Sequence, residues 1–160
     1  MEGMPAQLPM EPHSQDLRKG RCNEANRIYL LTTTTLQRQP LFKDWLVARI
    51  LIHAMRNQVE AHRVESLAFV VMPDHLHWLI VLQGNTTLAA LMHSVKGSSS
   101  RQINQLCGTN QPVWQNGYHD HAVREDEELV NVARYIVANP LRAGLVNKIG
   151  DYPFWDAKWL

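Results

Sequence analysis

Two histidines separated by a single residue, His75 and His77, are the first side chains here whose types and spacing could do chemistry. They begin the apolar run HLHWLIVL (75–82), which is typical of a strand. Because side chains alternate between the two faces of a strand, both imidazoles should point the same way, opposite to Leu76 and Trp78. Two imidazoles on one face of a rigid strand can bind a single divalent cation. The alternative is a pair of unrelated surface or core histidines, although imidazoles in so apolar a hairpin need partners.

A second candidate set lies near the C-terminal end, where residues 126–138 have the periodicity of a helix. One stripe of this helix collects the apolar side chains Leu129, Val130, Ala133, Ile136 and Val137. Tyr135 and Asn139 lie well away from that stripe and, being four residues apart, on a common face. A phenol can act as a nucleophile, and an amide oxygen suits Mg²⁺ or Mn²⁺. The alternative is an exposed tyrosine above an asparagine that caps the helix before Pro140.

Both sets need a scaffold, and the hydrophobic pattern of the chain predicts one. We expect strands at 27–35, 65–72, 75–82 and 119–124, with Pro73 and Asp74 as a tight turn between the middle two. We expect helices from Pro40 to about residue 61, from Leu88 onward with an interruption at Gly97, and over 126–138. The order β-α-β-β-α-β-α predicts an α+β fold of the ferredoxin-like split βαβ type. Its central antiparallel sheet would carry the histidine pair, and an added C-terminal helix would carry the tyrosine.

Length and composition limit the class of protein. A chain of 160 residues, 45% hydrophobic and 19% charged, suits one globular domain, which we place at 23–160 after a poorly ordered arm at 1–22. No apolar run is long enough to span a membrane, and the N-terminal residues lack the apolar core of a signal peptide. We therefore expect a cytoplasmic protein without a membrane partner. Cys22 and Cys107 are far apart in the sequence and are expected to be free thiols.

Three strings of sequence give the candidate residues a context. VVMPDHLHWLIVL (70–82), GYHDHAVRED (117–126) and ARYIVANPLRAGLV (133–146) closely resemble the REP-associated tyrosine transposases. These are single-tyrosine members of the HUH (His-hydrophobic-His) endonucleases, and the resemblance runs from about residue 27 to residue 151. It implies that His75 and His77 are the metal-binding pair. It also implies that Tyr135 is the nucleophile and Asn139 the third metal ligand.

The resemblance implies a transposase and endonuclease that cleaves and rejoins single-stranded DNA beside hairpin-forming repetitive extragenic palindromes. With Mg²⁺ or Mn²⁺ present, the phenol of Tyr135 would attack the scissile phosphate, expel the 3′-hydroxyl and leave a 5′-phosphotyrosine that permits rejoining. Related enzymes work as monomers or as homodimers that exchange helices. The family commonly has Asn where this chain has Asp74. Two other classes stay open: a catalytically silent DNA-binding regulator of the same fold, and a metal-dependent phosphodiesterase that activates water.

DNA must be held here without a strong net charge, because the formal net charge is only +1 at pH 7. A small basic patch or a metal ion must therefore replace a broad electropositive face. The candidate phosphate contacts are Lys96, Arg101, Arg124 and Arg142. The candidates for stacking on unpaired bases are Trp114 and Tyr118. For Trp114 the alternative is that it covers the core. His119 and His121 form a second pair of histidines, for which we favour packing or, for His121, DNA contact over metal binding.

Overall fold

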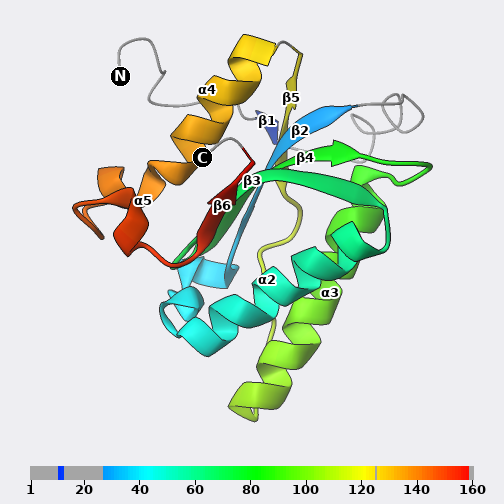
Figure 1. Cartoon of the computed structure of the whole chain (residues 1–160). Helices are drawn as coiled ribbons and strands as arrows, with labels where there is room; N and C mark the ends of the chain where they lie inside the picture. The colour runs from blue at the N-terminus through cyan, green and yellow to red at the C-terminus, as the bar shows by residue number, and fades with distance from the viewer. Residues whose placement is uncertain (1–10, 13–26, 125, 159–160) are drawn as a thin grey trace.

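Six strands form one antiparallel sheet in the part of the chain that the structure, a computed structural model, describes: residues 11–12, 27–124 and 126–158 (Figure 1). The strand order is β1-β5-β2-β4-β3-β6. The strands are β1 (Glu11–Pro12), β2 (Ile28–Thr34), β3 (Val64–Met72), β4 (His75–Leu82), β5 (His119–Val123) and β6 (Trp155–Ala157). The inner order β5-β2-β4-β3 is that of a ferredoxin-like split βαβ unit. The predicted α+β fold is therefore confirmed.

Helices cover both faces of this sheet. Among the described residues they are α2 (Trp45–Glu60), α3 (Leu88–Cys107), α4 (Asp126–Val137) and α5 (Asn139–Arg142). Short 3-10 turns lie at η1 (Leu36–Arg38), η2 (Leu41–Lys43) and η3 (Ile149–Asp151). In Figure 1, α2 and α3 lie together on one side of the sheet, and α4 and α5 lie on the other. The sheet therefore separates two hydrophobic clusters.

The alternation of side chains along β4 decides which cluster each residue joins. Leu76, Trp78 and Ile80 are fully buried in the cluster that contains α2 and α3. Leu79 is fully buried in the other cluster, together with Ile136 of α4. Because side chains two residues apart share a face, His75 and His77 must lie on the α4 side of the sheet. The predicted hairpin is confirmed, since Met72 and His75 are paired on either side of the Pro73–Asp74 turn.

The predicted interruption of the second helix at Gly97 is wrong, because α3 runs without a break from Leu88 to Cys107. A glycine inside a helix costs only about 1 kcal/mol relative to alanine. The burial of Val95 and Ile103 on either side of it holds the neighbouring turns against the core. The helix begins where the Thr87 side chain accepts a hydrogen bond from the Ala90 amide, and it ends at a left-handed Gly108.

The C-terminal helix also differs from the prediction. It ends at Val137, and a separate short helix, α5, begins at Asn139 and includes Pro140. Proline is tolerated in the first turn of a helix because the amide hydrogens there have no partner within the helix. Tyr135 and Asn139 therefore lie on two consecutive helices and not on one.

Two short edge strands, β1 and β6, were not expected from the sequence. β1 falls within the predicted arm at 1–22, and the rest of that arm, with Cys22, lies outside the described residues. Cys107 is an exposed free thiol. Within the described ranges, no helix has both the length and the apolar character needed to cross a membrane.

Candidate active site

His75 and His77 lie next to each other on the α4 side of β4. Their ring centroids are 4.8 Å apart, and the ring planes meet at 81°, edge to face. Both side chains are half-buried. The rigid sheet thus holds two imidazoles close enough to bind the same ion, as the HxH spacing predicts.

One hydrogen bond to Nδ1 fixes each ring. Asp74 Oδ1 lies 2.7 Å from His75 Nδ1, and Thr32 Oγ1 lies 2.7 Å from His77 Nδ1. Strand register supplies the second contact, because Thr32 of β2 is paired directly with His77 of β4. Histidines that bind metals usually engage their other ring nitrogen in this way, which fixes the tautomer and the ring orientation. The two Nε2 atoms are therefore the ones available to bind a cation.

The electrostatics of the pair favour metal binding. Burial, together with the charges of His75 and Arg142, lowers the pKa of His77 from 6.5 to about 3. The ring is then neutral at physiological pH, which is the form that binds metals. Partial burial raises the pKa of Asp74, but hydrogen bonds and charges from His75 and Arg38 outweigh it, so that this pKa is lower than usual. Arg38 Nε donates to Asp74 Oδ2 at 2.8 Å, and an ionised carboxylate is thus held against His75.

Tyr135 lies in the last turn of α4, and Asn139 begins α5. The Asn139 Nδ2 group donates to the carbonyl oxygens of Tyr135 at 3.4 Å and Ile136 at 3.3 Å, and so caps the end of α4. The capping alternative is therefore present, but it uses only the amide nitrogen. The amide oxygen is not used by these hydrogen bonds, and it is a metal ligand of the type that Mg²⁺ and Mn²⁺ prefer. Tyr135 is half-buried and stands outside the buried stripe of Val132, Ala133, Ile136 and Val137.

Arg142 connects the tyrosine to the histidines. Its guanidinium carbon lies 4.0 Å from the centroid of the Tyr135 ring, and its Nη2 donates to the Tyr135 carbonyl oxygen at 2.8 Å. The same charge is among those that lower the pKa of His77. Since α4 and α5 both pack on β3, the neighbour of β4, the three residues lie on one side of the sheet.

The donor set on this side of the sheet fits a divalent cation. In the described ranges, no three His, Cys, Asp or Glu side chains form a group that could hold a metal ion. A cation at the histidine pair therefore needs a donor of another type, and the Asn139 amide oxygen is one. Two imidazoles, each held through Nδ1, and a carboxamide oxygen are ligand types that suit Mn²⁺ or Mg²⁺.

The predicted DNA contacts lie in different environments. Trp114 and Tyr118 are buried, each only 7% exposed, which matches the alternative that Trp114 covers the core. The Trp114 indole donates to Ser99 Oγ at 3.1 Å. Lys96 is committed to two loop carbonyl oxygens, each 2.8 Å from its Nζ.

The other candidates lie nearer to the surface. Arg101 and Arg124 are exposed, and DNA contact by either stays a prediction. His121 Nε2 lies 3.0 Å from Glu128 Oε1 on α4, a contact that joins β5 to the helix carrying the tyrosine. His119 is paired with Thr32 in the neighbouring strand, so it lies in the same row of the sheet as His77.

The fold and the site together define a class of protein. The sequence profile described as "Transposase IS200 like" matches residues 24–139, and the chain belongs to that family. The match includes the histidine pair, Tyr135 and Asn139. The resemblance drawn from the three strings of sequence is thereby confirmed.

Two curated relatives and one solved structure resemble the chain more specifically. The REP-associated tyrosine transposase of Escherichia coli (strain K12) is 28% identical over 107 residues, 66% of this chain and 62% of the relative. A Haemophilus influenzae relative, also described as a REP-associated tyrosine transposase, is 28% identical over 111 residues, which is 63% of each chain. The chain thus spans less than two thirds of the length of either relative. A solved REP-associated tyrosine transposase bound to a REP hairpin has a TM-score of 0.69 and 24% identity, over 82% of this chain and 77% of that one. This match confirms the fold.

Proposed function

We propose that this protein is a metal-dependent endonuclease and strand transferase that acts on single-stranded DNA beside hairpin-forming palindromic repeats, through a covalent 5′-phosphotyrosine. The main support is the placement of Tyr135 on the same side of the sheet as His75 and His77, whose Nδ1 atoms are both engaged. Membership of the IS200-like transposase family supports the type of reaction. The similar structure described as bound to a REP hairpin supports the choice of substrate.

Tyr135 supplies the nucleophile. Its phenol gives up a proton to water, and the phenolate oxygen bonds to phosphorus as the bond from phosphorus to the 3′-oxygen breaks. The 3′-oxygen takes up a proton and leaves as a 3′-hydroxyl. His75, His77 and Asn139 would hold Mg²⁺ or Mn²⁺, which when bound supplies Lewis-acid stabilisation of the charge on the phosphate. One phosphodiester replaces another, so a second 3′-hydroxyl can rejoin the strand without ATP.

The neighbouring side chains position these groups. Thr32 and Asp74 hold the two imidazoles through Nδ1. Arg142 holds Tyr135 from both the ring face and the backbone carbonyl. We propose that one chain forms a complete site, because all these residues lie on one side of a single sheet. A homodimer that exchanges α4 is the alternative arrangement, and the cytoplasm is the compartment in which chromosomal DNA would be met.

A denaturing gel tests this function. The substrate is a labelled single-stranded oligonucleotide that carries a palindromic repeat found beside the encoding gene, incubated with the full chain and Mn²⁺. We expect a protein–DNA adduct with the wild type and none with Tyr135→Phe. EDTA or His77→Ala should abolish cleavage while leaving the chain folded and most of the DNA binding intact, because phosphate contacts dominate affinity. Cleavage without an adduct would instead indicate water as the nucleophile. Binding without cleavage in any metal would indicate a silent regulator.

A further inference from the structure

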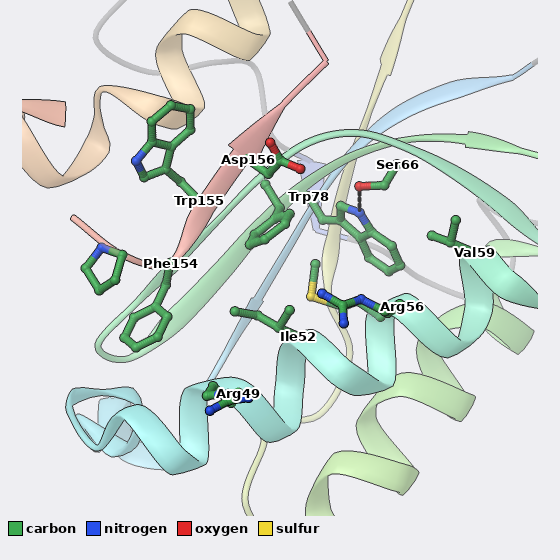
Figure 2. A pocket seen from close by; sticks show the side chains of 12 residues that line it. Arg49, Ile52, Arg56, Val59, Ser66, Trp78, Phe154, Trp155 and Asp156 are labelled. Carbon is green, nitrogen blue, oxygen red and sulfur yellow. Dashed lines mark hydrogen bonds between the residues drawn. The ribbon is translucent and has the colours of Figure 1, made fainter. Parts of the chain in front are cut away.

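A separate pocket lies on the opposite face of the sheet from His75 and His77. It has a volume of about 630 Å³ and is bounded by α2, the β3–β4 hairpin and the segment that leads into β6 (Figure 2). Pockets of this size take small molecules or single building blocks of a polymer. Phe69 of β3 and Trp78 of β4 pack in the α2 cluster, which places the pocket on that side of the sheet.

One wall of the pocket is a stripe of α2 with alternating charge and apolar character. It consists of Arg49, Ile52, Arg56 and Val59, at steps of three and four residues. Both arginines are exposed, and neither makes a hydrogen bond or ion pair with any described residue. Arg49 lies 5.4 Å from the ring centroid of Trp45, which is 56% exposed. Two guanidinium groups without acidic partners, beside an exposed indole, form a site for an anion with an aromatic part.

The opposite side of the pocket is a row of residues across the sheet. Asp156, Phe69 and Trp78 are paired in that order on β6, β3 and β4, so their side chains share one face. α2 covers Trp78 completely, but it leaves Phe69 half-buried and Asp156 exposed. Phe154 closes the end of the pocket, whereas the Trp155 indole points away and donates to the Ile149 carbonyl oxygen (Figure 2). The aromatic surface inside the pocket is therefore that of two phenylalanines.

Asp156 gives this side of the pocket a hydrogen-bond acceptor. Its Oδ1 accepts a hydrogen bond from the Ala157 amide at 2.9 Å, and no described residue donates to its Oδ2. The pocket thus has cations on one wall, aromatic rings in the middle and an acceptor across from the cations. A simple anion would contact only the cations. A nucleotide has a phosphate, a flat base and, in cytosine, an exocyclic amino group that donates to carboxylates.

We propose, on the basis of the DNA-cleaving function proposed above, that this pocket binds one unpaired nucleotide of the single-stranded DNA substrate. The phosphates contact Arg49 and Arg56, and the base stacks on Phe154 and Phe69. The amino group of the base donates to Asp156. Because β6 is an edge strand, a DNA strand that leaves the catalytic face can reach the pocket around this edge.

Fluorescence anisotropy of the full chain in EDTA tests the proposal, with labelled dC₂₀ and dT₂₀ as probes. We expect Arg49→Gln/Arg56→Gln to raise Kd by at least about 10-fold and to reduce the salt dependence by about 1.4 in log–log slope, since two phosphate contacts are lost. The control Lys43→Gln/Lys148→Gln removes the same charge elsewhere on the exposed surface and should change Kd less than about 2-fold. Equal losses in the two double variants would overturn the proposal.

Two further variants test the ring and the acceptor. Phe154→Ala should raise Kd by at least about 5-fold, because base stacking contributes strongly to affinity for single strands. Asp156→Asn should remove a preference for dC₂₀ over dT₂₀ that the wild type shows. Ultraviolet crosslinking of an oligonucleotide that contains 5-iododeoxyuridine should label the peptide carrying Phe154. Labelling confined to other peptides would place the DNA elsewhere and overturn the proposal.

The pocket and the cleavage function can fail independently. If the wild type forms the tyrosine adduct and the arginine variant binds DNA as the lysine control does, the pocket proposal is wrong and the cleavage function stands. If the arginine variant loses binding but no adduct forms in the wild type, the pocket proposal stands and the cleavage function is wrong.

Discussion

The guanidinium of Arg142 lies over the ring of Tyr135, 4.0 Å from its centroid, and also donates to the carbonyl oxygen of the same residue. These two contacts hold the tyrosine at both its ring and its backbone, across the break between α4 and α5. The sequence predicts a phosphate contact for Arg142, and the side chain is exposed in the structure. The geometry gives it a second role, as a positioning residue for the proposed nucleophile.

Replacing Arg142 by alanine should slow adduct formation about 10-fold, since a cation over an aromatic ring is worth about 0.5–2 kcal/mol. Single-turnover kinetics at saturating DNA measure this effect. Arg142→Lys should be intermediate, because it keeps the charge but loses the planar fork. Arg134→Ala, at an exposed position of α4, the helix that carries Tyr135, is the control and should leave the rate unchanged. An unchanged rate for Arg142→Ala with weaker DNA binding would show that Arg142 only contacts phosphate.

Replacing Asp74 by alanine should raise the Mn²⁺ concentration for half-maximal cleavage by about 10- to 100-fold, because removing the partner of a metal-bound histidine has effects of that size. The variant leaves His75 Nδ1 without its partner at 2.7 Å. Asp74→Asn keeps an acceptor oxygen and should behave nearly as the wild type does. A metal titration of cleavage measures both. The role given to Asp74 is wrong if the alanine variant needs no more metal than the asparagine variant.

Stability in EDTA should fall as the pH drops below about 6.5, because the pKa of His77 is about 3 in the folded chain and about 6.5 in the unfolded chain. Between these values the unfolded chain binds one more proton, so acid favours unfolding by up to about 1.4 kcal/mol per pH unit. Urea unfolding of the wild type and of His77→Gln from pH 4 to 8 measures this term. The variant should show a smaller slope. Identical slopes would mean that folding does not lower the pKa of His77.

Tyr152 provides a second pH dependence, at the alkaline end. Its hydroxyl donates to the Val71 carbonyl oxygen, and burial raises the pKa of Tyr152 to about 12. The unfolded side chain ionises near pH 10, so this term stabilises the fold below pH 10 and is lost as the pH rises to about 12. Tyr152→Phe should cost about 1 kcal/mol at pH 7 and should lose less stability than the wild type above pH 10. Urea unfolding at pH 7 and pH 11 measures both differences. If the wild type and Tyr152→Phe lose the same stability between these two pH values, Tyr152 does not contribute to the loss of stability at alkaline pH.

Local sequence patterns were enough to predict much of the site. The alternation of residues 75–82 fixes the shared face of His75 and His77, because strand geometry has a period of two. The helical stripe excludes Tyr135 from the core in the same way. Both signals lie within one element and need no knowledge of the tertiary structure.

The remaining contacts depend on tertiary structure. Thr32 meets His77 only because β2 pairs with β4 in one particular register, and no local pattern encodes this contact between residues 45 positions apart. Arg142 reaches Tyr135 because the chain breaks its helix between Val137 and Asn139, whereas the sequence predicted one helix that stops at Pro140. β6 has three residues, too short to show alternation, so the pocket beside Asp156 was also missed.

Mass spectrometry of the trapped adduct tests the central claim most directly. The full chain is incubated with labelled hairpin DNA and Mn²⁺, digested with nuclease and trypsin, and searched for a peptide that carries a 5′-linked nucleotide. We predict that the modification lies on the phenol oxygen of Tyr135 and that no modified peptide appears after Tyr135→Phe. A nucleotide linked to any other residue, or cleaved DNA with no modified peptide, would contradict the account.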